Sequence, residues 1–292
     1  MTQEIIKIVG IEVQMPYHDE VYIVGEKPDG HISGIVRNAG IVKEIRLAED
    51  DDSIQERDVV YIKMEKKEIK LDCEKIKKNY NEILEDIKKY SSNPGKVKLL
   101  FVSKYFDVCQ HKEIVKMGYN YFGENRAQLY RDKLNEIGNN GIKWDFIGRL
   151  QKNKIKYIIE SVNLIHSIDS YDLLLEINKK AAEHGRIVNG LIQINVSKEE
   201  SKTGIYIEDF EKDYEKYFSQ SNVKIIGFMT MAPFSATTDE IDNYFKKMQE
   251  LKEKFSKKYD YLTELSMGMS NDYKIALKNG ATIIRIGSKL FE

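Results

Sequence analysis

The 292-residue sequence has few of the residues that secreted or metal-dependent proteins rely on. Its only two cysteines, Cys73 and Cys109, have neither the spacing of metal ligands nor that of a disulfide framework. We therefore expect two free thiols in a reducing cytosol. The five histidines are scattered along the chain and form no cluster of metal ligands, so we expect no metal site.

Long apolar runs and an excess of one charge are also missing. No apolar segment approaches the roughly 20 residues of a membrane-spanning helix, and the N-terminus shows no signal-peptide pattern. Lysine and arginine number 46, and aspartate and glutamate number 47, so the charges nearly cancel. These absences predict a cytoplasmic protein with neither membrane nor nucleic-acid partners.

Two regions with different patterns make up the chain. Residues 1–70 are rich in valine and isoleucine, are punctuated by glycine, and predict a small all-β module of unknown role. Five segments of this region resemble strands: 4–9, 20–24, 32–36, 41–47 and 59–64. Residues 71–90 then carry an apolar stripe with helical spacing, and strands alternate with helices through the rest of residues 71–292.

The alternation after residue 95 contains eight strand-like segments. They cover residues 96–103, 119–122, 143–147, 164–168, 187–196, 223–229, 262–266 and 282–286. The helical patterns between them cover 107–117, 125–137, 151–161, 170–184, 207–219, 238–257 and 271–278. Eight strands and the lack of a glycine-rich dinucleotide turn predict a (β/α)8 TIM barrel rather than a doubly wound sheet. The sequence shows no eighth helix, and the helix at 71–90 is available to cover that gap.

The first barrel strand ends in a lysine, Lys104. Residues 99–103 read as a strand buried on both faces. Functional groups in such barrels lie at the carboxyl ends of the strands, so Lys104 would project into the mouth. Burial there favours the neutral amine, which is the nucleophilic form. The alternative is a strand-end lysine that merely reaches water.

The segments after the seventh and eighth strands predict an anion site. Gly268 allows close backbone approach, and Ser270 can cap the next helix or donate its hydroxyl. Gly287 and Ser288 supply a second loop of the same kind, and Arg285 supplies a charge. A lysine amine and a phosphate cup on opposite sides of one mouth suit pyridoxal 5′-phosphate (PLP), whose aldehyde forms a Schiff base with lysine.

Eight collinear motifs between residues 73 and 291 resemble the YggS/PROSC family of PLP homeostasis proteins. They are FVSK (101–104), FGEN (122–125), FIGRLQKNK (146–154), HSID (166–169), QINVS (193–197), GFMTMAP (227–233), LSMGMS (265–270) and RIGS (285–288). The resemblance implies the barrel of the alanine racemase N-terminal domain, with PLP bound on Lys104. It also implies that Asn125 lies beside the ring, and that Ser270, Arg285, Gly287 and Ser288 hold the phosphate.

Other residues in these motifs have two interpretations each. Ser266, Gly268 and Met269 share one motif and are candidate cofactor contacts. Met231 could pack on the pyridine face or simply fill the core. Arg285 could meet the ring nitrogen instead, where it would keep that nitrogen unprotonated and weaken the electron sink.

Three polar residues near the predicted mouth also remain open. Lys202 follows the fifth strand and could be a second amine at the mouth or a solvated loop lysine. Asp169 and Asn195 follow the fourth and fifth strands and could be helix caps.

Three functions compete. The resemblance implies a PLP carrier, without robust catalysis, that supplies PLP-requiring apo-enzymes or keeps the free aldehyde low. The sequence does not give the oligomeric state, and we favour a monomer. The alternative is a PLP-dependent amino-acid racemase, which needs a base on each face of its substrate. Tyr17, Tyr22 and Tyr61 of the β module are its candidates for a second base. The third is a partner-binding protein that acts through residues 1–70. We rank the three in that order.

Overall fold

The computed structural model describes residues 71–291, apart from 105, 140, 200 and 201, and the backbone of five strands within residues 1–70. The chain divides into two units, residues 1–70 and 71–292. No helix in the described part of the chain is long and apolar enough to cross a membrane.

The N-terminal unit contains two sets of paired strands. Strands β1 (Lys7–Glu12), β2 (Glu20–Lys27) and β3 (Gly30–Arg37) form an antiparallel sheet in chain order, and β4 (Ile41–Glu44) pairs antiparallel with β5 (Lys63–Glu65). The other parts of the predicted strands 4–9, 41–47 and 59–64 lie outside the described residues, as do Tyr17 and Tyr61.

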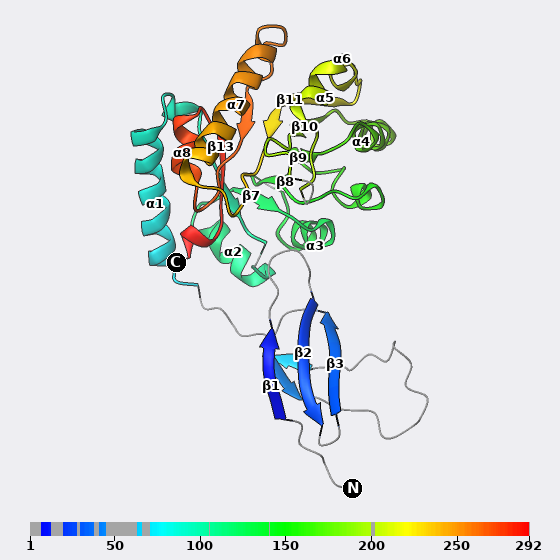
Figure 1. The fold of residues 1–292 in the computed structure, drawn as a ribbon, viewed down its shortest axis with the longest axis vertical. Coiled ribbons are helices and arrows are strands. Elements are labelled where there is room, and N and C mark those ends of the chain that lie inside the picture. The colour runs from blue at the N-terminus through cyan, green and yellow to red at the C-terminus, as the bar shows by residue number, and fades with distance from the viewer. Residues whose placement is uncertain are drawn as a thin grey trace. The chain divides into compact units, whose positions relative to one another are not determined.

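The second unit is a closed parallel barrel surrounded by helices (Figure 1). Its strands are β6 (Lys98–Val102), β7 (Tyr121–Glu124), β8 (Lys143–Phe146), β9 (Leu164–Ile168), β10 (Val188–Gln193), β11 (Val223–Met229), β12 (Glu264–Ser266) and β13 (Ile283–Ile286). All eight lie within two or three residues of the predicted segments, and the predicted barrel is confirmed. Pairing of β13 with β6, with Ile286 opposite Phe101, closes the ring.

The helices that cover the strands also follow the sequence closely. They are α1 (Cys73–Tyr90), α2 (Val108–Lys116), α3 (Ala127–Ile137), α4 (Tyr171–Glu183), α5 (Ile207–Lys212), α6 (Glu215–Phe218), α7 (Thr238–Ser256) and α8 (Tyr273–Lys278), with 3₁₀ turns η1 (Pro94–Lys96), η2 (Lys152–Tyr157) and η3 (Ser288–Leu290). Ser170 caps α4, because its hydroxyl accepts the Leu173 amide at 3.2 Å.

Two predicted helices are shorter than expected. The segment predicted as 151–161 forms only the 3₁₀ turn η2 and further turns, because the Arg186 guanidinium binds the carbonyls of Ile159 and Val162 and satisfies them without a longer helix. The helix predicted at 207–219 breaks at Asp213, whose carboxylate binds Lys216 Nζ at 2.9 Å.

Helix α1 covers the seam of the barrel, as predicted. It contacts α8 and η3, and Asn79 Nδ2 donates to the Leu290 carbonyl at 3.2 Å. Its buried face includes Ile76, Ile83 and Ile87. The amphipathic helix that precedes the first strand therefore packs against the end of the last one.

Apolar packing occurs in two places. A large layer fills the space between strands and helices, and a small cluster of Leu100, Leu164, Leu191, Met229 and Ile283 lies inside the ring of strands. Alternation along each strand directs successive side chains to these two layers. The small interior cluster leaves room for polar side chains on the inward faces of other strands.

His111 of α2 is an unpaired polar residue in the outer layer. It is fully buried, its ring lies 4.2 Å from that of Phe122 and 4.7 Å from that of Trp144, and neither ring nitrogen has a hydrogen-bond partner within the described residues. Burial, assisted by the Lys133 charge, lowers the pKa of His111 to about 3.

This lowered pKa predicts a pH-dependent loss of stability. Below the ordinary histidine pKa of 6.5 the unfolded chain takes up a proton that folded His111 does not bind, so stability present above pH 6.5 is lost towards pH 3. Urea unfolding of the wild type and His111→Phe should show the wild type losing about 1 kcal/mol more between pH 6 and pH 5. Parallel curves for the two proteins would contradict the burial of a neutral imidazole.

Candidate functional site

The closed barrel brings the predicted site residues to the carboxyl-terminal rim of its strands. Lys104 follows β6 and is half-buried, Asn125 follows β7, and Met231 follows β11. Residues 268–270 follow β12, and residues 287–288 follow β13. The expected position of the lysine opposite the phosphate cup is wrong, because β6 pairs directly with β13 and Lys104 is next to the last loop.

The loops after β12 and β13 are fixed to each other. Gly268 has a φ of +91°, which favours glycine, and its carbonyl accepts the Arg285 amide at 2.9 Å. The Ser270 hydroxyl accepts the Lys289 amide at 3.2 Å. Ser270 therefore joins the two loops and does not cap α8. Gly287 and Ser288 start the short η3 turn in the second loop.

Asp272 shapes the first of these loops. Its carboxylate accepts the Met269 amide at 2.5 Å, and burial raises its pKa while the Arg285 and Lys202 charges oppose that shift. The side chain of Met269 is exposed, at 37%. The loop is thus held from within by a carboxylate, and Met269 lies on its outer surface.

Arg285 lies inside the barrel and not in the two loops. Its Nη1 donates to Ser266 Oγ at 2.6 Å, and its Nη2 donates to the Thr230 carbonyl at 2.9 Å. Burial lowers the pKa of Arg285 to about 10, and the charge of Asp272 opposes that shift. The guanidinium is therefore fixed below the mouth by the ends of β11 and β12.

A hydrogen-bonded chain continues from Arg285 across the interior. Ser266 Oγ lies 2.9 Å from His166 Nδ1, and His166 Nε2 lies 2.9 Å from Asp145 Oδ2. The carboxylate only accepts, which assigns the imidazole proton to Nε2 and leaves Nδ1 to accept from Ser266. Burial lowers the pKa of His166, against the opposing effect of Asp145, in keeping with a neutral ring.

Asn125 has an unused polar atom. Its Oδ1 oxygen is buried and has no hydrogen-bond partner among the described residues. The loop after β8 packs closely against the backbone of Asn125, since a Cβ on Gly148 would lie 1.9 Å from the Asn125 carbonyl oxygen. A buried amide without a partner costs free energy unless a ligand or water satisfies it.

The loops around the mouth contain three further predicted residues, which are Met231, Lys202 and Asn195. Met231 is partly buried against the interior apolar cluster. Lys202 Nζ donates to the Ala232 carbonyl at 2.9 Å, and burial lowers the pKa of this lysine, opposed by Glu199. Asn195 Nδ2 binds the carbonyls of Glu199 and Lys202, so Asn195 holds its own loop and is not a helix cap.

Burial also affects Asp169, the residue after β9. Its pKa is raised by burial, and the positive charge of Arg149 opposes that shift. The adjacent Ser170 makes the helix cap, so the predicted capping role belongs to Ser170.

The sequence patterns did not predict a buried ion pair between Lys133 and Glu124. Lys133 Nζ donates to Glu124 Oε1 at 2.6 Å and to the Ser103 carbonyl at 2.7 Å, directly below the ends of β6 and β7. The available signal was a lysine on the apolar face of the α3 helix, three residues after the buried Tyr130. Lys133 was overlooked because helix lysines are usually solvated.

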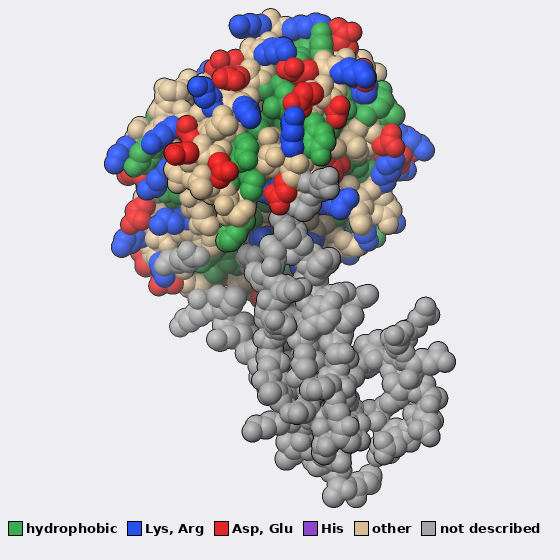
Figure 2. Space-filling view, in the orientation of Figure 1, with side chains coloured by type: hydrophobic (Ala, Val, Ile, Leu, Met, Phe, Trp, Pro, Cys, Tyr) green, Lys and Arg blue, Asp and Glu red, His purple; other side chains and the backbone are tan. Residues whose placement is uncertain are grey.

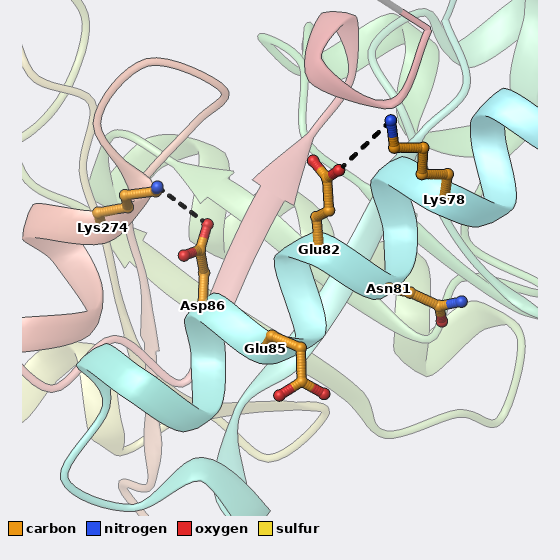
Figure 3. A pocket seen from close by; sticks show the side chains of 6 residues that line it. All are labelled: Lys78, Asn81, Glu82, Glu85, Asp86 and Lys274. Carbon is orange, nitrogen blue, oxygen red and sulfur yellow. Dashed lines mark ion pairs between the residues drawn. The ribbon is translucent and has the colours of Figure 1, made fainter.

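The outer surface formed by the described residues of the barrel unit offers no comparable group. A depression between α1 and α8 is lined by Lys78, Asn81, Glu82, Glu85, Asp86 and Lys274, with ion pairs from Lys274 to Asp86 and from Lys78 to Glu82 (Figure 3). Acidic and basic side chains are interspersed on the face drawn in Figure 2. The described residues contain no group of three or more potential metal ligands.

Comparisons with known proteins place this barrel in a family. A sequence model described as "Alanine racemase, N-terminal domain" matches residues 71–292. A pyridoxal phosphate homeostasis protein of Aquifex aeolicus is 37% identical over 224 residues, which cover 75% of this chain and 96% of that protein. The chain belongs to the pyridoxal phosphate homeostasis protein family.

A solved structure of this family is also similar. PipY of Synechococcus elongatus shares 30% identity, and its structure with PLP bound matches with a TM-score of 0.66 over 74% of this chain and 100% of PipY. The structure of PipY without PLP matches with a TM-score of 0.68. The described barrel thus corresponds to the whole of a family member whose structure contains PLP.

The close packing of Gly268 yields a test of the loop geometry. A Cβ at Gly268 would lie 2.6 Å from Ala276 Cβ, whereas Gly118, with a similar φ of +95°, has open space around it. Gly268→Ala should therefore lower the free energy of unfolding by about 2 kcal/mol more than Gly118→Ala, because only Gly268→Ala adds a steric clash to the backbone strain. Equal losses in urea unfolding would show that the loop can move aside.

Proposed function

We propose that this chain binds PLP covalently on Lys104 and carries it in intracellular PLP homeostasis. The observation that carries the proposal is the convergence on one rim of a half-buried lysine, a buried amide oxygen without a partner and two glycine–serine loops fixed to each other. The PLP-containing structure of PipY, at 30% identity, supports the same ligand.

The described residues fit this cofactor. The unpartnered Asn125 Oδ1 would accept a hydrogen bond from a polar group of the cofactor, and the positive φ of Gly268 shapes the loop after β12. When bound, PLP supplies an aldehyde whose carbon forms a C=N bond with a lysine amine, while its oxygen leaves as water. Lys104 would provide that amine.

We assign the remaining residues by their place in the barrel. Gly268, Ser270, Gly287 and Ser288 would bind the phosphate through backbone amides and hydroxyls of the two joined loops. Asn125 would lie beside the ring. Met231 would cover one face of the ring from the end of β11. Met269 would support these contacts through its backbone. Ser266 would support them through its hydrogen bond with Arg285.

We assign Arg285 to the ring nitrogen and not to the phosphate. Its guanidinium is bonded inside the barrel to Ser266 and Thr230, away from the loops that follow β12 and β13. A guanidinium there would donate to the nitrogen and keep it unprotonated, which would weaken the ring as an electron sink. This would limit the carbanion chemistry available to the site.

The wider properties follow from the same proposal. The protein would act as a cytoplasmic monomer that delivers PLP to PLP-requiring apo-enzymes. Residues 1–70 would form a separate small β module that takes no part in holding the cofactor. The family model begins at residue 71, which supports this division.

Substitution of Lys104 tests the covalent link. The full-length protein loaded with PLP should absorb near the visible–ultraviolet border, and borohydride reduction followed by mass mapping should place the adduct on Lys104. Lys104→Ala should lose the band entirely because no amine remains in reach, whereas Lys202→Ala should keep it.

Two results would contradict the proposal. Full retention of the band in Lys104→Ala would assign the cofactor to another lysine. Racemisation of an amino acid by the loaded wild type at about 1 s⁻¹ or faster would identify an enzyme and not a carrier.

Removal of residues 1–70 tests the independence of the barrel. The truncated chain 71–292 should bind PLP with the same absorption band and an affinity within about twofold of the full chain, measured by titration at equal protein concentration. A lost band in a truncated protein that is still folded by circular dichroism would show that the N-terminal unit completes the site.

A further inference from the structure

Three buried side chains join the two strand ends that lead into Lys104 and Asn125. Ser103 and Glu124 are 0% exposed and Lys133 is 2% exposed. Glu124 Oε1 accepts from Ser103 Oγ at 2.6 Å and from Lys133 Nζ at 2.6 Å. Ser103 immediately precedes Lys104, and Glu124 immediately precedes Asn125. We call Ser103, Glu124 and Lys133 the β6–β7 clamp.

The clamp begins where the backbone pairing between β6 and β7 ends. The last backbone bond between the strands runs from the Ser103 amide to the Gly123 carbonyl at 3.2 Å. The Ser103 carbonyl then accepts from Lys133 Nζ at 2.7 Å and from the Phe106 amide at 3.0 Å. The backbone that carries Lys104 is therefore directed by a side chain of α3 and no longer by its neighbouring strand.

The clamp is better explained by geometry than by stability. Burying an ion pair costs desolvation that offsets most of the attraction, so a well-packed apolar replacement is often as stable. Burial lowers the pKa of Lys133, and Glu124 opposes that shift. Three short bonds to two adjacent strand ends, however, fix their relative direction in a way that apolar contacts would not.

We propose that Lys133 is a positioning residue for the Lys104 amine. It acts through Ser103 and Glu124, without contact with the cofactor, and holds the end of β6 so that Lys104 enters the mouth in the right direction. This inference rests on the proposed binding of PLP at Lys104.

The test separates the amine step from cofactor binding. Pyridoxine 5′-phosphate has the phosphate and ring of PLP but no aldehyde, so its affinity reports binding alone. Lys133→Met/Glu124→Gln removes both charges together and avoids leaving one buried charge unpaired. In this full-length variant the rate constant for appearance of the PLP band should fall roughly ten- to a hundredfold, while pyridoxine 5′-phosphate affinity stays within about twofold.

A matched pair at the other end of the barrel provides the control. Lys98 Nζ donates to Glu264 Oε1 at 2.6 Å at the amino ends of β6 and β12. Lys98→Met/Glu264→Gln removes a pair of the same length, with a half-exposed lysine, far along the strands from Lys104 and should leave both measurements as in the wild type. Ser103→Ala removes one clamp bond and no charge, and should show the same selective loss of rate on a smaller scale even if the charge variants fail to fold.

The outcomes distinguish this inference from the proposed function. A wild-type protein without a Lys104 adduct would overturn the proposed function. A normal adduct at Lys104 with unchanged rates in both the double variant and Ser103→Ala would overturn the role of Lys133 alone. Parallel losses of rate and of pyridoxine 5′-phosphate affinity would also overturn it, because they would show general damage to the site.

Discussion

Pairing between the first and last strands of the barrel is the constraint on which the site depends. The β6–β13 register places Phe101 opposite Ile286, although 185 residues separate them in the chain. This pairing brings Lys104 beside the loop that begins at Gly287. Without ring closure, the lysine and the loops proposed to bind phosphate would lie at opposite edges of an open sheet. The chemistry proposed for the mouth therefore depends first on the strand topology, which brings the site residues together.

The interior of the barrel adds a second constraint, which is a chain of buried polar side chains with defined partners. Arg285, Ser266, His166 and Asp145 form a chain in which each donor faces an acceptor. At its far end, Tyr121 and Asn163 also donate to Asp145. Such a network has one satisfied arrangement, so it fixes the guanidinium that points towards the mouth. The barrel floor is thus rigid where the proposed ring nitrogen would lie.

Much of this fold could be predicted from the sequence, because strands buried on both faces and amphipathic helices have distinct periods. The eight strands, the seam helix α1 and the rim positions of Lys104 and Asn125 all followed from that pattern and from the family motifs. The neighbouring position of Lys104 and Gly287 was overlooked, although closure of the predicted barrel pairs its first strand with its last. The partners of Arg285 and Lys133 were also out of reach, because residues 9 to 55 positions away supply them. The helix predicted at 151–161 was misjudged because Arg186 satisfies the carbonyls of Ile159 and Val162, which follow η2.

Helix α1, which covers the seam of the barrel, has a consequence for folding during synthesis. Its bond from Asn79 to Leu290 joins residues 211 positions apart. At a translation rate of about 5 to 20 residues per second, roughly 10 to 40 seconds pass between the synthesis of α1 and that of Leu290. During that interval Ile76, Ile83 and Ile87 have no native surface to cover them. Nascent chains of this barrel therefore expose the apolar face of α1 until residue 290 has been synthesised.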